Sequence, residues 1–485
     1  MSERASTRIE AHVWRIAFVV VIGSIMSILD TTIVNVALDR LGTELHTTLA
    51  DIQWVITGYM LSLAAVIPVT GWAARRFGAK RIYLVSLVLF TAGSALCGLA
   101  DSANELIVFR IIQGVGGGMI LPIGQLMMAR AAGPNRMGRV MSIVAVPAML
   151  APILGPTLGG LILDNASWRW IFYVNVPIGA IAFFAALRAL PHGDREEAGS
   201  LDLIGLALMV TGLPLLTYGL AEIGETGGFS STKVYVPVLG GLALVGLFVR
   251  HALRASQPLL QLRLYRRGTF SSASIAMFCL GSALFGSMIL LPLYWQQVRH
   301  ESVVDTGLLT APLGLGMAVI MPLAGRLTDR FGGGPLALIG VTVTTVATVP
   351  FAFIGAHTSI LWLAIAMVVR GMGVGCAFMP AMSAAFASLQ AHELPDATPQ
   401  LNVLQRIGGS IGTALLAVVL QRALVHAHTS AAFAAGYGTA FWWATALTGL
   451  AIVPCIVLVR AERAAKQARP AVVHTLNEPV VEGAA

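Results

Sequence analysis

The sequence predicts an all-α polytopic membrane protein with fourteen transmembrane helices. Its 485 residues are 56% hydrophobic and only 11% charged, whereas about a quarter of the residues in a soluble domain are charged. The mean hydropathy is +0.80. Apolar runs of roughly 20 residues, the length that crosses a bilayer core, recur along the whole chain and are separated by short polar segments.

These runs follow one another so closely that no soluble domain is expected between them. The expected spans are 15–38, 52–74, 81–100, 105–129, 140–163, 169–190, 202–222, 233–253, 270–298, 306–326, 335–356, 359–388, 402–425 and 438–459. The polar ends are expected to form cytoplasmic tails, 1–14 and 460–485.

The basic residues predict the orientation of the spans. With the N-terminus inside, 24 of the 31 Lys and Arg residues fall in cytoplasmic segments, Arg406 among them, and five fall outside. Arg110 and Arg370 lie within spans. This asymmetry is the positive-inside rule, which predicts that the N- and C-termini are both cytoplasmic. The basic residues are therefore read as anchors at the membrane lipid, and nucleic acid is not expected as a partner.

An internal repeat divides the chain. The segment 71–78 recurs as 325–332 at an offset of 254 residues, and Arg110 recurs as Arg370 at an offset of 260. Parallel repeats of six spans organise one large class of transporters. The chain is therefore expected to hold an N-terminal six-helix bundle (15–190), two inserted helices (202–253) and a C-terminal six-helix bundle (270–459).

One carboxylate stands out within this pattern. Of 23 acidic residues, only Asp30 lies clearly inside an expected span. Holding a charge there costs a few kcal/mol, so by default it marks an ion or proton pathway. Arg110 is the expected partner because it lies ~8 Å from the outer end of its span, and Asp30 is also in the outer half of its own. A static structural ion pair is the alternative.

Several polar side chains within the spans could line a substrate cavity or make helix–helix hydrogen bonds, and both interpretations stay open. They are Asn35, Tyr59, Gln113, Gln125, Tyr294, Asn402 and Gln405. Arg370 has no acidic counterpart in the second repeat, where the stretch aligned with Asp30 is apolar, and a structural role is expected for it.

The loops argue against an enzyme. They carry no nucleophile–base pair, no metal-ligand cluster and no phosphate-binding glycine loop. Each of the four cysteines stands alone in an apolar run, which is typical of packing residues. No metal and no cofactor are expected.

Several stretches carry distinctive motifs. The first-span stretch 29–38 reads LDTTIVNVAL, and the fifth-span stretch 147–160 contains Gly155 and Pro156. The other stretches are 71–81, 325–333, 110–116 and 168–177. Together they resemble the major facilitator superfamily, specifically its fourteen-span drug:proton antiporter branch, in which the fifth-span pattern is associated with antiporters. The resemblance covers essentially the whole chain, although Arg75 stands where the family usually places an aspartate.

The resemblance implies the major facilitator fold and a set of residues that gate alternating access. The loop residues would form a charged latch between helix ends, and the fifth-span glycines a close helix contact; topology anchoring and generic packing are the alternatives. The residues concerned are Gly71, Arg76, Gly78, Arg81, Gly155, Pro156, Gly159, Gly160, Gly325, Asp329, Arg330 and Gly332.

The resemblance also implies a function. We expect a proton-coupled exporter in the bacterial inner membrane that moves lipophilic or cationic small molecules outward, with Asp30 and Arg110 coupling the proton gradient to transport. Export of one endogenous metabolite, antibiotic or siderophore is the alternative, and a nutrient symporter is disfavoured by the fifth-span motif. A periplasmic adaptor would be a partner if the host is Gram-negative. The oligomeric state is not predicted.

Overall fold

The computed structural model describes residues 10–133, 136–191, 199–226, 228, 231–425, 427 and 429–467. Every regular element among them is a helix. The first helices are α1 (Ala11–Glu44), α2 (Leu49–Ile52), α3 (Trp54–Val66), α4 (Thr70–Phe77), α5 (Ala79–Leu99), α6 (Ala103–Ala132), α7 (Met137–Asn165), α8 (Trp170–Tyr173) and α9 (Asn175–Ala189). A pair follows, α10 (Leu203–Thr226) and α11 (Thr232–Arg254). The remaining helices are α12 (Gly268–Met288), α13 (Leu290–Gln297), α14 (Val303–Phe331), α15 (Gly333–Thr348), α16 (Ile360–Ala387), α17 (Leu394–Leu424), α18 (Ser430–Leu450) and α19 (Ile452–Gln467). Short 3-10 helices are η2 (Ile67–Val69), η3 (Leu262–Arg266), η4 (Val349–Phe353) and η5 (Ala391–Glu393).

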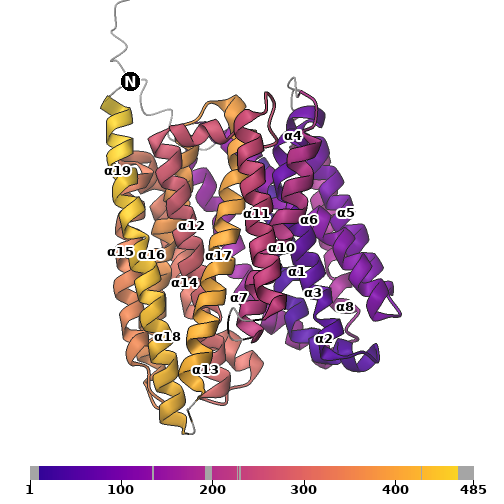
Figure 1. Ribbon diagram of the computed structural model, residues 1–485, viewed down its shortest axis with the longest axis vertical. Coiled ribbons are helices and arrows are strands. Elements are labelled where there is room, and N and C mark those ends of the chain that lie inside the picture. Colours follow the sequence, from indigo (N-terminus) through magenta and orange to yellow (C-terminus); the bar gives the residue numbers. More distant parts are fainter. Residues whose placement is uncertain are drawn as a thin grey trace, which may run out of the picture.

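The helices form two groups that lie side by side (Figure 1). We call α1–α9 the N-terminal half and α12–α19 the C-terminal half. The halves meet where α7 packs along α14 and where α4 and α6 pack against α17. The pair α10 and α11 is packed together, and α10 contacts both α3 and α17, so the pair bridges the two halves.

Large apolar side chains are exposed around the outside of the bundle, among them Phe18, Leu203, Val319 and Leu361. Buried positions include many polar and small residues. An exposed apolar surface of this extent fits contact with lipid rather than water. The helices therefore turn their apolar side chains outward as well as inward, as expected for a polytopic membrane protein.

The repeated loop segments end their helices in the same way. Gly78 follows α4 with φ of 88°, and Gly332 follows α14 with φ of 100°. Only glycine adopts such positive φ values without strain, so each glycine ends one helix and turns the chain directly into the next. The repeat seen in the sequence is thus also a repeat of backbone conformation.

Thirteen helical segments are long and apolar enough to cross a membrane among the described residues. They correspond to all the expected spans except 140–163. The helix α7 occupies that place, but the side chains of several of its residues, Pro156 among them, are outside what the structure describes. Fourteen spans and the cytoplasmic location of both termini stay predictions.

The start of the thirteenth span differs from the expected one. The expected span 402–425 left Arg406 near a cytoplasmic loop, whereas α17 begins at Leu394. Arg406 therefore lies inside a helix that is long enough to cross the membrane. Two prolines and several polar residues near the start of α17 lower its local hydropathy, and this made the segment look like a loop.

Candidate functional site

Asp30 lies in the middle of the N-terminal half with no exposed surface. Three side chains donate hydrogen bonds to its carboxylate. Arg110 Nη1 lies 2.5 Å from Oδ2, while Gln113 Nε2 and Asn175 Nδ2 each lie 2.9 Å from Oδ1. The donors come from α6 and from the first residue of α9, so the carboxylate joins three helices. We call these four residues the Asp30 network.

The guanidinium of Arg110 is held from several sides. Nη1 also donates to Gln113 Oε1 at 2.8 Å, and Nε donates to the carbonyl oxygen of Val55 at 3.2 Å. Its Cζ lies 4.0 Å from the centre of the Tyr59 ring. Arg110 is only 1% exposed. The buried guanidinium is therefore stabilised by a carboxylate, two further oxygen acceptors and an aromatic face.

Close helix contacts hold α6 in position. A Cβ on Gly114 would lie 2.0 Å from Ser62 Oγ, and one on Gly116 would lie 2.5 Å from the backbone nitrogen of Phe90. These glycines let α3 and α5 approach the backbone of α6. Small residues of this kind allow tight packing between membrane helices. The glycines that follow Arg110 in the sequence therefore let α3 and α5 pack closely against the helix that carries Arg110 and Gln113.

Asn175 is a member of the network that the sequence did not single out. It belongs to the family-like stretch 168–177, where a lone amide after an apolar run was the only signal. Its Nδ2 also donates to Ser94 Oγ at 3.1 Å. Its Oδ1 has no hydrogen-bond partner among the described residues. The amide thus leaves an acceptor unused next to Asp30.

Among the residues expected to line a cavity, two lie at the Asp30 network and two others pair across the halves. Tyr59 and Gln113 are buried at the Asp30 network. Gln125 Oε1 accepts a hydrogen bond of 2.8 Å from Asn402 Nδ2, which links α6 to α17 across the two halves. Tyr294 is buried elsewhere, in α13, and donates to the carbonyl oxygen of Gly355.

The last two cavity candidates differ from these. Asn35 is exposed on α1, and Gln405 is partly buried on α17. No side-chain hydrogen bond joins either residue to the other candidates within the described part of the chain. A shared substrate cavity for the seven residues stays a prediction.

The second loop segment forms an ion pair across the two halves. Asp329, at the end of α14, accepts hydrogen bonds of 2.8 Å from the backbone nitrogen of Gly138 and from Arg139 Nε. Both donors lie in the first turn of α7, where unpaired backbone N–H groups favour an anion. A Cβ on Gly325 would lie 2.8 Å from the Cα of Arg139, so the glycine lets α14 approach α7 closely enough for this contact.

The first loop segment also forms an ion pair across the halves, with its charges exchanged. Arg75 of α4 pairs with Asp396 in the first turn of α17. A Cβ on Gly71 would lie 2.2 Å from the carbonyl oxygen of Pro395, so α4 rests directly on the start of α17. Arg75 stands where the family usually places an aspartate, and the acid of this contact is Asp396 on the opposite helix.

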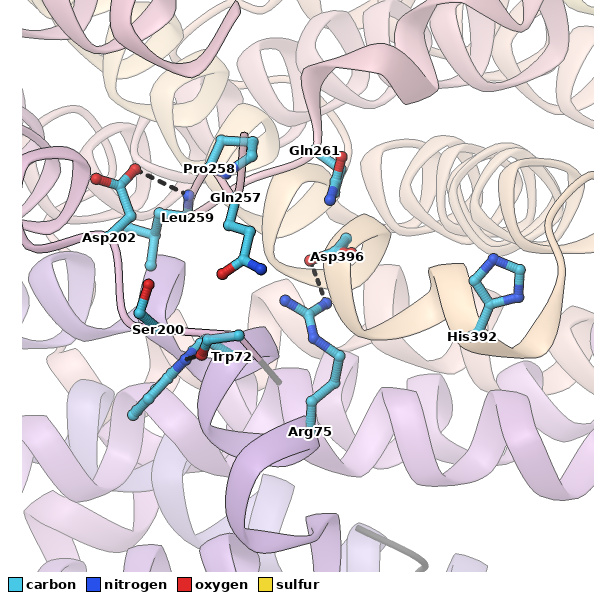
Figure 2. Close-up of a pocket in the computed structure, with 11 residues that line it drawn as sticks. Trp72, Arg75, Ser200, Asp202, Gln257, Pro258, Leu259, Gln261, His392 and Asp396 are labelled. Atoms are coloured by element: carbon cyan, nitrogen blue, oxygen red, sulfur yellow. Dashed lines mark hydrogen bonds and ion pairs between the residues drawn. The ribbon is translucent and has the colours of Figure 1, made fainter. Parts of the chain in front are cut away.

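Figure 2 shows this ion pair at the edge of a cavity of about 400 Å³. The cavity is lined by residues of α4 and α17 and by the segments just before α10 and just after α11. Asp202, just before α10, accepts hydrogen bonds from His251 and from the backbone nitrogen of Leu259. The Arg75–Asp396 pair therefore faces, across this cavity, the segments that flank the inserted helices.

The other loop residues do not cross the interface. Arg76, Arg81 and Arg330 are exposed. Arg330 stacks over Phe331, with Cζ 5.1 Å from the ring centre. These arginines fit the role of topology anchors, while Asp329 and Arg75 make the contacts between the halves.

The fifth-span glycines lie between α1 and α14. A Cβ on Gly155 would lie 2.0 Å from Thr32 Oγ1, and one on Gly159 would lie 3.3 Å from the carbonyl oxygen of Ile33. Gly160 faces the other way, toward Val304 of α14. Thr32 and Ile33 follow Asp30 closely on α1, so α7 touches the helix that carries the network.

No group of three or more metal-ligating side chains occurs among the described residues.

Comparisons with known proteins agree with this architecture. The family model described as Major Facilitator Superfamily matches residues 20–413. The chain is 39% identical to the multidrug resistance protein B homolog of Mycobacterium tuberculosis over 417 residues, which are 85% of this chain and 77% of that protein. It is 30% identical to the multidrug export protein EmrB of Escherichia coli over 408 residues, 81% of this chain and 77% of that protein.

Solved structures share the fold at low sequence identity. The human organic anion transporter MFSD10 superposes with a TM-score of 0.64 at 15% identity, covering 92% of this chain and 99% of that chain. The proton:xylose symporter XylE gives a TM-score of 0.65 at 13% identity, covering 92% of this chain and 95% of that chain. A multi-span helical protein with such bacterial relatives fits the inner membrane. The chain belongs to the major facilitator superfamily, whose members are transporters rather than enzymes.

Proposed function

We propose that this protein is a proton-coupled exporter of lipophilic or cationic small molecules. The observation that carries the proposal is the burial of Asp30, Arg110, Gln113 and Asn175 in one hydrogen-bonded network. A carboxylate at membrane depth is retained at a cost, which is typical of proton pathways. The names of the relatives, which refer to multidrug export and resistance, support the choice of cargo.

The network can accommodate either protonation state of Asp30. In the charged state the carboxylate accepts bonds from Arg110, Gln113 and Asn175. After protonation Asp30 needs an acceptor, and rotation of the Asn175 amide by half a turn would present its unused Oδ1. The bond to Arg110 weakens at the same time because the negative charge is gone. Proton binding would thus loosen the contact between α1 and α6, and the rotated Asn175 amide would give up the bonds that its Nδ2 now donates to Asp30 and Ser94.

Alternating access would follow from this local change. The helix α1 carries Asp30 and packs against α7, and α7 packs against α14 of the C-terminal half. Movement of α1 can therefore reach the interface between the halves. On the expected cytoplasmic side, the Arg75–Asp396 and Arg139–Asp329 pairs join the halves, and they must separate for substrate to enter from that side. Proton binding and substrate binding would favour different states, which is how a gradient drives export.

The test is transport by Asp30→Asn in reconstituted vesicles with an imposed proton gradient. The amide keeps the size of the side chain but cannot bind and release a proton, so gradient-driven export should be lost while substrate binding is partly kept. Asp39→Asn is the matched control, because Asp39 is an exposed acid on the same helix. Export by Asp30→Asn at the wild-type rate would refute the proposal. A susceptibility panel in an efflux-deficient host, with the same two variants, would separate a broad cargo from a single metabolite.

A further inference from the structure

Arg370 is a buried arginine that the Asp30 network does not use. It lies on α16 and is 2% exposed. Its Nη2 donates to Ser287 Oγ on α12, and its Nε has no hydrogen-bond partner among the described residues. The serine hydroxyl in turn donates to carbonyl oxygens of its own helix, Ala283 and Leu284. Within the part of the chain that the structure describes, the partner of the charged group is therefore a neutral oxygen.

Comparison of the two repeats shows that, within the described ranges, Arg370 lacks the carboxylate partner that Arg110 has. Arg110 on α6 reaches across to Asp30 on α1, whereas Arg370 on α16 reaches across to Ser287 on α12. The two arginines are 260 residues apart, and Asp30 and Ser287 are 257 residues apart. Ser287 thus occupies the position of the carboxylate in the second repeat. Both repeats hold a buried arginine, and its partner is a carboxylate in the first repeat and a hydroxyl in the second.

The acids of the C-terminal half lie elsewhere. Among the described residues they occur near helix ends, and most have other partners. Asp305 bonds to Ser302, Asp329 to Arg139, Glu393 to Arg267, Asp396 to Arg75, and Glu462 to the backbone of Gly333 and Gly334. Glu301 lies in the segment before α14. None is paired with Arg370 in the described part of the chain.

A buried charge without a counter-charge is strongly unfavourable, because the interior repays little of the lost hydration. Beside Arg370 lies a small cavity of about 10 Å³, lined by Thr344 and Thr448 and otherwise by apolar residues. A cavity of on the order of 10–15 Å³ holds about one water molecule. The cavity can hold a single water molecule or small ion and is too small for a drug-sized substrate.

We propose that this cavity binds a small inorganic anion, with chloride as the physiological occupant, as the counter-ion of Arg370. The unpartnered Nε supplies a donor, and the guanidinium supplies the charge. The anion takes the place that the carboxylate of Asp30 fills in the first repeat. It is held as a fixed part of the C-terminal half, independently of whether Asp30 couples protons to export.

The experiment measures thermal unfolding of the purified full-length protein in sodium chloride, sodium bromide and sodium gluconate at equal ionic strength. Wild type should unfold several degrees higher in chloride or bromide than in gluconate, because an ion that binds only the folded state stabilises it. The increase should saturate with chloride concentration. Equal unfolding temperatures in all three salts would mean that the cavity holds only water, and the proposal would fail.

Two variants locate the effect. Ser287→Asp places a carboxylate where Asp30 stands in the first repeat, so it should remove the chloride dependence while keeping the stability that wild type has in chloride. Ser287→Ala leaves Arg370 intact and should keep the dependence. A chloride effect of unchanged size in Ser287→Asp would overturn the assignment.

A direct measurement does not depend on how well the variants fold. In crystals of the wild-type protein grown in bromide, an anomalous-scattering peak is expected within hydrogen-bond distance of Arg370. Absence of that peak would contradict the proposal. Stabilisation by acetate equal to that by chloride would also contradict it, because the site would then accept an organic carboxylate.

Discussion

Arg75 pairs with Asp396 across the interface between the two halves, with the positive charge on the loop segment and the negative charge on the opposite helix. In the equivalent contact of the second repeat, Asp329 carries the negative charge on the loop segment and Arg139 the positive charge on the opposite helix. Both contacts are made in the first turn of a helix, α17 and α7. The polarity of one contact is reversed, while its place in the structure is kept.

This reversal predicts the outcome of a charge exchange. Arg75→Asp or Asp396→Arg alone would place like charges together in a largely buried contact, so each should weaken the joint between the halves and reduce export. The double variant restores an ion pair with the polarity of the second repeat and should recover most of the activity. A double-mutant cycle on thermal stability should give a coupling energy of about 1–3 kcal/mol.

Arg76→Asp is the control for this exchange, because Arg76 is the exposed neighbour of Arg75. Export by Arg76→Asp should stay near the wild-type rate. If the double variant is as inactive as the worse single variant, the two residues do not act as a pair.

Arg110 should determine the pH at which export works best. Arg110→Ala removes the charged hydrogen-bond partner of the Asp30 carboxylate. It should therefore change the pH profile of export and lower the maximum rate. The profile is measured in vesicles with the internal and external pH set separately. A lower rate with an unshifted profile would assign Arg110 a purely structural role.

Asn175 should have a smaller effect of the same kind. Asn175→Leu removes one hydrogen bond to the Asp30 carboxylate, and a bond to a charged group contributes about 1.5–3 kcal/mol. We expect a partial loss of export and a smaller change of the pH profile than in Arg110→Ala. Ser94→Ala is the control, since Ser94 contacts Asn175 but not Asp30. A shift of the same size in both variants would point to the packing of α9 rather than to the network.

The sequence predicted the helical membrane fold, the repeat and the contact between Asp30 and Arg110. These features depend on hydropathy, local spacing and depth along a helix, all of which can be read from one chain. Asn175 was missed because one amide in an apolar helix looks the same whether it meets a carboxylate or a backbone carbonyl. Asp396 and Arg406 were missed because the polar start of α17 resembles a loop in hydropathy.

The sequence alone does not determine which polar side chains share a substrate cavity, for a related reason. Which polar side chains share a cavity depends on how two halves, far apart in the sequence, are packed against each other. Gln125 and Asn402 are 277 residues apart and yet hydrogen-bonded. Tyr294, chosen on the same grounds, packs instead against Tyr437 within the C-terminal half.

The contact between α7 and α1 gives the last prediction. Gly155→Ala would place a methyl group 2.0 Å from Thr32 Oγ1, so the two helices must separate. Overpacking of this kind costs about 1–3 kcal/mol, and it acts two residues after Asp30. Gly155→Ala should therefore lower both thermal stability and export. Gly160→Ala is the matched control, because its new methyl group would meet Val304 at an ordinary 3.4 Å. Thr32→Ala added to Gly155→Ala should recover part of the loss, since the hydroxyl makes the shortest contact. If Gly155→Ala and Gly160→Ala behave alike, the close approach of α7 to α1 has no special part in transport.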